Sequence, residues 1–545
     1  MTRTTCRILT AAFLLLSGGS LFAGDEPQKR RYLVGTEGAS WTIEHPFREP
    51  RGVRTFRHVR GFAVEMTEAE AADLGRQRGI RFVELDPVRH ILEGPRTPAA
   101  RRPFPAEGGT QQTPYGVGQT NASMVWPVTR GAGVKVAVID TGIDTRHPDL
   151  VDAYAGGWDF VNDDADPQDD NGHGTHVCGT IAATDNTSGV VGVAPEVELF
   201  AVKILDAEGS GSGGDLIAAV DWAIDNGMNV INMSLGGPSS SILEREAFER
   251  ASAAGIVSVA ASGNNHPDRL FVDFPAAYFA VIAVGAIDET ESITSFSQRG
   301  PEMGLVAAGL EVLSTVFLGE AYLVESSAFD TIIAFPMEYS TEPASVSGTI
   351  VDCGRGGIAE FPSGVAGNIA LIERGDRTFR EKSDNAKSAG AKAAIIFNNE
   401  AGIFFGTLCA AEPCIPPNTP TNPILTVSAA MEDGEILLGR SGEPVTIELG
   451  SASDYGLNNG TSMATPHVAG VAALLKALDP TASVDAIRNA MQTTARDLGQ
   501  TGFDTIYGYG LADAYAAGVF LAPWRFDPPE PGPRRRGVRR PGSGR

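Results

Sequence analysis

Three short segments, far apart in the chain, carry residue types that can do chemistry together. Asp140 ends an apolar run, His173 lies in the Gly-rich turn Asn-Gly-His-Gly-Thr-His, and Ser462 lies in Asn-Gly-Thr-Ser-Met-Ala-Thr-Pro-His. Taken singly, each has an ordinary explanation, because acids at strand ends and Gly-flanked serines commonly cap or turn the backbone. A serine hydroxyl is a weak nucleophile unless a base takes its proton, and that base needs a carboxylate to fix its tautomer. Together, the three segments therefore indicate an Asp-His-Ser relay.

The surrounding sequence alternates between two patterns. Continuous apolar runs typical of buried strands recur at 134–139, 199–204, 230–233, 257–260 and 281–284. Helical patterns lie between them, as at 214–226 and 243–254. Buried strands alternating with helices predict an α/β fold whose parallel sheet is covered on both faces. The strand ends and helix starts of such a sheet are where open α/β folds place their sites.

The three segments resemble the signatures of the subtilisin-like serine proteases (subtilases), in which the order along the chain is also Asp, His, Ser. The resemblance covers residues 110–318 and 451–523 and implies the family's three-layer fold around a mostly parallel central sheet. It implies that Asp140 orients the base, that His173 is the general base and acid, and that Ser462 is the nucleophile. Asn264, in Ala-Ala-Ser-Gly-Asn, would donate its side-chain amide to the oxyanion.

The resemblance also implies a cleft that binds the substrate backbone as an added β-strand, with glycines that permit close approach. The expected edges of this cleft are Gly209, Ser210, Gly211, Ser234, Leu235 and Gly236.

The preference for the residue before the cut stays open. Asp273 aligns near the base of the corresponding pocket, where a carboxylate would favour Arg or Lys. Leu92, at the expected self-cleavage site, favours apolar residues instead. A third interpretation is that Asp273 faces water.

The loop 184–190 has the length of the family's calcium-binding loop. The resemblance implies an all-oxygen site for a structural Ca²⁺ ion, of the kind that this ion prefers. Its expected ligands are the side chains of Gln111, Asp149 and Asn186 and the backbone carbonyls of Thr184, Ser188 and Val190. The alternative is a plain Asn-Ser-Gly turn.

No catalytic metal is expected. His173 and His176 have helical spacing, but no Glu lies between them as in a His-Glu-x-x-His zinc site. We expect His176 and His467 to be structural hydrogen-bonding residues and Cys178 to be a buried, inert thiol.

The two ends of the chain have their own patterns. Residues 1–24 combine two arginines, a short apolar run and small residues, which predicts a signal peptide and a secreted protein, extracellular or periplasmic. Residues 25–92 resemble the family's inhibitory propeptide, with self-cleavage after Leu92. The Pro- and Arg-rich linker 93–109 is either retained as an extension or trimmed by a second cut near Gly109. Residues 524–545 form a Pro- and Arg-rich tail.

Residues 319–450 interrupt the alternation and resemble a protease-associated (PA) domain, which is non-catalytic and binds or gates protein substrates. Strands are expected at 367–372 and 393–398, with a helix at 378–390. Cys353, Cys409 and Cys414 lie in this insert. One disulfide with a third thiol left over is expected in an exported protein, and the pairing stays open.

The chain has 43 Lys and Arg against 67 Asp and Glu, a net charge of −24. An acidic surface disfavours nucleic acids and anionic membranes as partners, and no apolar run is long enough to span a membrane. The resemblance and the predicted signal peptide imply a secreted, monomeric serine endopeptidase, made as an autoprocessed zymogen and acting on proteins or peptides. The alternatives are a catalytically dead binding protein, against which the intact relay argues, and a processing protease with few substrates.

Overall fold

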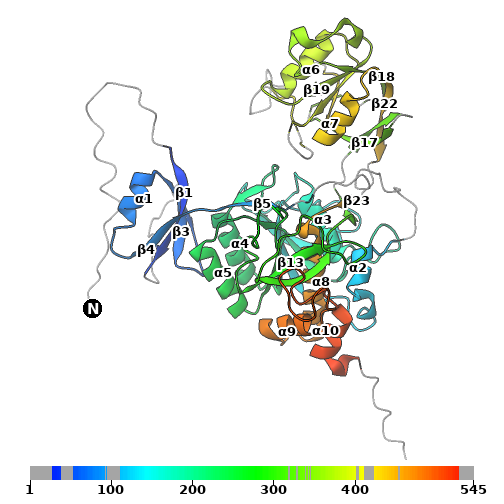
Figure 1. The fold of residues 1–545 in the computed structure, drawn as a ribbon. Coiled ribbons are helices and arrows are strands. Elements are labelled where there is room, and N and C mark those ends of the chain that lie inside the picture. The colour runs from blue at the N-terminus through cyan, green and yellow to red at the C-terminus, as the bar shows by residue number, and fades with distance from the viewer. Residues whose placement is uncertain are drawn as a thin grey trace, which may run out of the picture.

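The computed structural model describes residues 28–37, 53–92, 94, 111–316, 320–326, 329–337, 339–341, 343, 345–399, 404, 406–409, 423–451 and 455–526. The predicted signal peptide, almost all of the predicted linker and most of the predicted tail lie outside these residues. Figure 1 shows an N-terminal domain, a large central body and an inserted barrel. In the part of the chain that is described, no helix is long and apolar enough to cross a membrane.

A seven-stranded, fully parallel sheet forms the centre of the large body, which confirms the predicted α/β class. The apolar runs form its inner strands, where side chains on both faces are buried. The strands, in spatial order, are β14 (Met303–Ala308), β13 (Val281–Ile287), β12 (Val257–Ala261), β10 (Val230–Met233), β6 (Lys135–Asp140), β8 (Glu198–Lys203) and β7 (Tyr154–Asp159).

Helices cover the sheet. Helix α3 (His173–Ala182) packs against α8 (Thr461–Leu478), and α8 also contacts four strands of the sheet. Helices α4 (Gly213–Asp225) and α5 (Ile242–Ala253) pack together on the side nearest the N-terminal domain (Figure 1). The remaining helices of this body are α2 (Tyr115–Gln119), α9 (Val484–Thr494) and α10 (Ala514–Leu521).

The N-terminal domain is a small α+β unit. Its antiparallel sheet has the order β2 (Val53–Thr55), β3 (Gly61–Met66), β1 (Arg30–Thr36) and β4 (Ile80–Leu85), and its helix is α1 (Glu68–Leu74). Thr67 and Glu70 form a capping box at the start of α1. The helix ends at Leu74 with Gly75 as its cap, and Gly79, with a φ of +92°, turns the chain into β4.

A short strand leaves the N-terminal domain and joins the central body. Strand β5 (Val88–Ile91) lies between β9 (Ser210–Ser212) and β11 (Leu235–Gly236), antiparallel to both. The chain segment that follows β4 therefore closes a three-stranded sheet on the surface of the central body.

The insert leaves and returns through a pair of antiparallel strands, β15 (Val312–Thr315) and β23 (Tyr455–Asn458). It is a closed barrel with its own hydrophobic core and two helices, α6 (Phe379–Ser388) and α7 (Met431–Leu438). The segments expected as strand, helix and strand form β19, α6 and β20. The barrel strands, in spatial order, are β16 (Glu320–Ser326), β17 (Phe329–Pro336), β21 (Leu425–Ala429), β20 (Ala393–Phe397), β19 (Ile369–Glu373), β18 (Ser345–Asp352) and β22 (Pro444–Ser451).

Two of the insert's three cysteines lie in described segments. Cys409 is disulfide-bonded, whereas Cys353 is a free thiol with no exposed surface. Burial raises the pKa of Cys353 to about 12, so this thiol is unreactive at neutral pH. Cys353 is therefore the thiol left over, and Cys414 lies outside the described residues.

Candidate active site

Asp140 and His173 form a buried pair at the carboxyl end of the central sheet. Asp140 is the last residue of β6 and His173 the first residue of α3, and neither side chain has exposed surface. His173 Nδ1 lies 2.7 Å from Asp140 Oδ1, and the Thr141 N–H donates to the same oxygen at 2.8 Å. A carboxylate accepts only, so His173 carries its proton on Nδ1, which leaves Nε2 as the ring nitrogen that can accept a proton.

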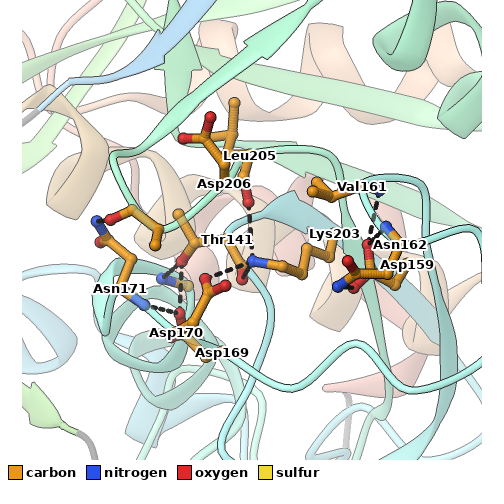
Figure 2. Close-up of polar contacts among 12 residues, drawn as sticks. Thr141, Asp159, Val161, Asn162, Asp169, Asp170, Asn171, Lys203, Leu205 and Asp206 are labelled. Carbon is orange, nitrogen blue, oxygen red and sulfur yellow. Dashed lines mark hydrogen bonds and ion pairs between the residues drawn. The ribbon is translucent and has the colours of Figure 1, made fainter. Parts of the chain in front are cut away.

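A second aspartate, which the sequence motifs did not reveal, fixes the start of α3. Asp169 Oδ1 accepts from the Thr141 hydroxyl at 2.8 Å and from the Gly172 N–H at 2.9 Å. Its Oδ2 accepts from the backbone N–H and the hydroxyl of Thr175, at 2.8 and 2.6 Å. Figure 2 shows Asp169 beside Thr141 and Asn171. One buried carboxylate thus links the segment after Asp140, at the end of β6, to the first turn of α3, which begins at His173.

A buried lysine holds the other side of this turn (Figure 2). Lys203 Nζ donates to Asp170 Oδ1 at 2.6 Å and to the carbonyls of Thr141 and Leu205 at 2.7 and 2.9 Å. Burial raises the pKa of Asp170 above its usual value, and Lys203 opposes that shift. Three acceptors satisfy the three protons of the ammonium, so this charge fixes the loop rather than taking part in proton transfer.

Ser462 is the second residue of α8, which begins at Thr461. Its hydroxyl donates to the Ser234 carbonyl at 2.8 Å, and the Ser234 hydroxyl donates to the Ser462 carbonyl at 2.7 Å. Pro466 lies inside the helix and has no N–H for the Ser462 carbonyl, four residues earlier. Ser234 supplies the hydrogen bond that the proline cannot make.

The amide of Asn264 has a defined orientation. Its Oδ1 accepts from the backbone N–H and the hydroxyl of Thr461, at 3.0 and 2.9 Å. The Nδ2 group therefore points away from Thr461, and it donates to the Leu92 carbonyl oxygen. Asn264 and Ser462 thus contact the same residue, because the Leu92 N–H donates to Ser462 Oγ at 3.2 Å.

The predicted cleft strands flank the segment that ends at Leu92. In the antiparallel register, Leu235 and Gly236 face Ile91 and His90. On the other edge, β9 pairs with β5, the Ile91 N–H donates to the Gly209 carbonyl at 2.9 Å, and Ser210 Oγ lies 2.9 Å from His90 Nδ1.

Two of the cleft glycines are required for close approach. A Cβ at Gly209, where φ is +72°, would lie 2.8 Å from the Ile91 side chain. A Cβ at Gly236 would lie 2.8 Å from Leu92 Cδ1. Both distances are too short for real contacts, so a side chain at either position would narrow the cleft.

Comparison with known proteins covers both main parts of the chain. The model described as "Subtilase family" matches residues 131–338 and 441–510, and the model described as "PA domain" matches residues 335–437. This chain belongs to the subtilase family. It is a serine endopeptidase that carries a PA domain.

Several relatives of this subtilase are known. Subtilisin DY from Bacillus licheniformis is 47% identical over 208 residues, which are 38% of this chain and 75% of that protein. Subtilisin E from Bacillus subtilis (strain 168) is 36% identical over 320 residues, 57% of this chain and 78% of that protein. A solved psychrophilic subtilisin-like protease, Apa1 from Pseudoalteromonas sp. AS-11, matches 77% of this chain and 100% of its own, with 31% identity and a TM-score of 0.49.

In this subtilase, Asp273 is neither exposed nor unpaired. Its side chain is fully buried, and Arg269 Nη1 donates to its two oxygens at 2.7 and 3.0 Å. Burial raises the pKa of Asp273, and Arg269 opposes that shift. Asp273 lies beneath the cleft, since a Cβ at Gly236 would be 3.3 Å from Asp273 Cβ. The interpretation that it faces water is therefore wrong, and its negative charge is already compensated.

The six residues expected around calcium lie in one network. Asp149 has no exposed surface and accepts from Asn186 Nδ2 at 2.7 Å and from the Val190 N–H at 3.0 Å. Gln111 Nε2 faces the carbonyls of Thr184 and Val190, at 2.9 and 3.3 Å, and Ser188 donates to Asn186 Oδ1. The Asp149 carboxylate, two side-chain amides and backbone carbonyls meet here. When the amides of Gln111 and Asn186 turn their oxygens inward, this is an all-oxygen donor set that fits Ca²⁺. Among the described residues, no three His, Cys, Asp or Glu side chains form a metal cluster.

The other histidines and Cys178 have structural surroundings. His176 bonds the carbonyls of Val312 and Gly456, and burial lowers its pKa to about 3. His467 bonds the Met463 carbonyl, and burial lowers its pKa to about 4. Cys178 is fully buried on α3, and burial raises its thiol pKa well above the usual value. Neither histidine is protonated at neutral pH, and the thiol is inert.

Carboxylates of the N-terminal domain cap two helices of the central body. Glu84 Oε1 accepts from the Ser241 hydroxyl at 2.8 Å and from the Ile242 N–H at 3.0 Å, at the start of α5. Asp86 Oδ1 accepts from the Gly214 N–H at 2.9 Å, at the start of α4. Helix N-termini attract negative charge, so these contacts hold the domain against the enzyme.

Proposed function

We propose that this subtilase is a secreted endopeptidase, made as a zymogen that cuts itself after Leu92 and is then inhibited by residues 25–92. The observation that carries the proposal is the position of Leu92, with its carbonyl oxygen at the Asn264 amide and its N–H at Ser462 Oγ. A segment held in this way presents its own carbonyl carbon to a serine hydroxyl.

The proposed reaction begins with the transfer of the Ser462 hydroxyl proton to His173 Nε2 while Oγ attacks the carbonyl carbon of the residue before the cut. Asp140 stabilises the resulting imidazolium through the Nδ1–H bond, for which the 2.7 Å distance is the support. The negative charge that develops on the carbonyl oxygen is stabilised by the Asn264 amide and by the Ser462 backbone N–H. This N–H lies in the first turn of α8 and has no partner within the helix.

The tetrahedral adduct then breaks at its C–N bond. His173 gives its proton to the leaving amine, and the acyl group stays on Ser462 Oγ. A water molecule, deprotonated by His173, attacks the acyl carbon in the same way and releases the acid. The proton then returns to Ser462.

Two further parts of the proposal concern stability and substrate. A structural Ca²⁺ ion would be held by the side chains of Gln111, Asp149 and Asn186 and by the carbonyls of Thr184, Ser188 and Val190. The ion would cross-link the loop 184–190 and would take no part in the reaction. The barrel spanning residues 320–451 would act as the PA domain, which binds or gates protein substrates without catalytic residues. The enzyme is proposed to act as a monomer.

Casein hydrolysis tests the function. The purified wild-type chain should degrade casein, and Ser462→Ala should lose that activity and accumulate as an uncleaved precursor. N-terminal sequencing of the mature form should begin at Glu93, or near Thr110 if the linker is trimmed. Equal casein hydrolysis by both proteins, or a precursor that is cut normally in Ser462→Ala, would rule out this assignment.

A further inference from the structure

Arg89 is a charged residue with no exposed surface, although it belongs to the segment that occupies the cleft. It is the fourth residue before the Leu92 cut and pairs with Gly211 in β9. Its Nη2 lies 2.5 Å from Glu244 Oε2 and donates to the Ser239 carbonyl at 2.9 Å, while Nη1 donates to the Val88 carbonyl at 3.1 Å. The guanidinium therefore fills a closed pocket of the enzyme rather than lying along its surface.

The acid of this pocket belongs to the enzyme. Glu244 lies in the first turn of α5, has no exposed surface, and receives a hydrogen bond from the Tyr278 hydroxyl at 3.1 Å. The pocket leaves no room for a larger residue at Gly213, where a Cβ would lie 2.6 Å from Glu244 Oε1. Glu244 is thus fixed in place by groups that remain when the N-terminal domain leaves.

Other ion pairs between the N-terminal domain and the enzyme differ from this one. Arg81 pairs with Glu246 and Arg57 with Asp225, but all four side chains keep substantial exposure, between 24% and 78%. They lie outside β5 and its neighbouring strands. The Arg89–Glu244 pair is fully buried and is part of the cleft itself.

Departure of the segment 88–92 would leave Glu244 without its cation. A buried carboxylate that loses its partner is costly, and a cation of the incoming chain restores the pair. We infer that the cleft of this subtilase selects arginine at the fourth residue before the cut, with Glu244 as the specificity-determining residue. This inference rests on the proposed function, because it takes substrates to bind in the register of residues 88–92.

Arginine should bind better than lysine. The guanidinium reaches Glu244 and two carbonyl oxygens with two of its nitrogen atoms. A lysine ammonium is a single point charge and does not reproduce this planar set of donors. The preferred substrates are therefore proteins or peptides with Arg three residues upstream of the residue at the cut.

A peptide series in the mature wild-type enzyme tests the inference without any variant. Peptides X-His-Ile-Leu with a chromogenic leaving group are compared, where X is arginine, lysine, leucine or citrulline, the neutral counterpart of arginine with a similar shape. The citrulline peptide cannot form the buried charge pair with Glu244. We therefore expect kcat/KM for the arginine peptide to exceed that for the citrulline peptide by about 10- to 100-fold. Equal values for arginine and citrulline, or a higher value for leucine, would overturn the inference. If neither casein nor any of the peptides is cleaved, the proposed function itself fails.

Matched variants locate the effect. Glu244→Gln should bring the arginine and citrulline peptides to similar kcat/KM values, and the ratio of these two values within each enzyme is the quantity compared. Glu246→Gln, two residues later on α5 and outside the cleft, should keep the full arginine preference. A Glu244→Gln enzyme that still prefers arginine as strongly as the wild type would remove Glu244 from the assignment. If that variant does not mature, the wild-type peptide series decides alone.

Discussion

Thr461 orients the amide of Asn264 through two hydrogen bonds to one oxygen, from its backbone N–H at 3.0 Å and from its hydroxyl at 2.9 Å. The nitrogen of the same amide donates to the Leu92 carbonyl. The direction of the Asn264 dipole therefore depends on the residue directly before the proposed nucleophile.

Removal of the Asn264 amide or of the Thr461 hydroxyl should lower kcat more than it raises KM. Asn264→Ala should lower kcat by about 100- to 1000-fold, the loss measured for such a donor in a subtilisin. Thr461→Val removes one of two orienting bonds and should cost about 5- to 10-fold in kcat. Thr465→Val is the matched control, because the Thr465 hydroxyl donates to the Thr461 carbonyl and not to Asn264. A Thr461→Val effect confined to KM would contradict the orienting role.

Asp140→Asn should leave the fold intact but reverse the hydrogen bond to His173. The Asn amide nitrogen can only donate, so facing His173 it favours the imidazole tautomer whose proton is on Nε2. In that tautomer Nε2 cannot accept the serine proton. Self-cleavage and casein hydrolysis should both slow by about 10⁴-fold, the loss found for the corresponding change in another serine protease. A mature protein that appears at the wild-type rate during refolding would contradict the relay.

Asp86 should make the precursor less stable as the pH rises from about 4 to about 6. Burial raises its pKa to about 6; Arg31 opposes that shift, and Asp215 and Glu244 add to it. The folded precursor therefore binds a proton that the unfolded chain releases near pH 4, so the stabilisation is full below pH 4 and lost above pH 6. The effect is at most about 3 kcal/mol.

Asp86→Asn tests this dependence in the uncleaved Ser462→Ala background. Urea unfolding of the two proteins at pH 4, 5, 6 and 7 gives the free energy of unfolding for each. The difference between them should change by about 2–3 kcal/mol across the range, in favour of Asn at high pH. A constant difference would show that Asp86 titrates normally.

Calcium removal should shorten the half-life of the mature enzyme at elevated temperature. An ion present at about 100 times its Kd adds about 2.7 kcal/mol to the folded state, and EGTA removes that contribution. Asp149→Asn should lose the EGTA response, whereas Asp185→Asn should keep it, because Asp185 pairs with Arg130 outside the oxygen cluster. An inactivation rate that EGTA leaves unchanged in the wild type would remove the site.

The residue before the cut should be apolar rather than basic. Arg269 already neutralises Asp273, and the position corresponding to Leu92 lies against Gly236. Peptides that vary only this residue should show Leu cleaved at least about tenfold faster than Arg, because burying a second cation beside the pair is unfavourable. A preference for Arg would mean that the Arg269–Asp273 pair opens when substrate binds.

Much of the fold could be predicted because its signals are local. The inner strands of the central sheet are continuous apolar runs, and the proposed catalytic residues lie in compact motifs. The edge strands β7 and β14 are not among the expected strands. Strand β7 contains two glycines and ends in Asp159, which weakens its apolar pattern, whereas β14 is as fully buried as the inner strands. Pro466 lies inside α8, and the hydrogen bond that it cannot make is supplied by Ser234, more than 200 residues away.

The roles of Asp169, Lys203 and Glu244 could not be predicted from their neighbours in the sequence. Each is a charged residue whose function depends on a partner in a distant segment: the Thr141 turn for Asp169 and Lys203, and Arg89 for Glu244. A lone Asp, Lys or Glu is usually exposed, and only the three-dimensional structure shows that these three are buried. The same holds for Asp273, whose charge is compensated by Arg269.

The insert lies between His173 and Ser462 along the chain, so the three residues of the proposed relay are not made together. A chain emerging from the ribosome contains the proposed inhibitory segment, Asp140, His173 and Asn264 long before Ser462, the proposed nucleophile, is added. No partly synthesised or partly exported copy that ends before residue 462 can cut a peptide bond by this route. Under the proposed mechanism, the order of synthesis alone therefore keeps an unfinished chain inactive, whether or not the proposed inhibitory domain is bound.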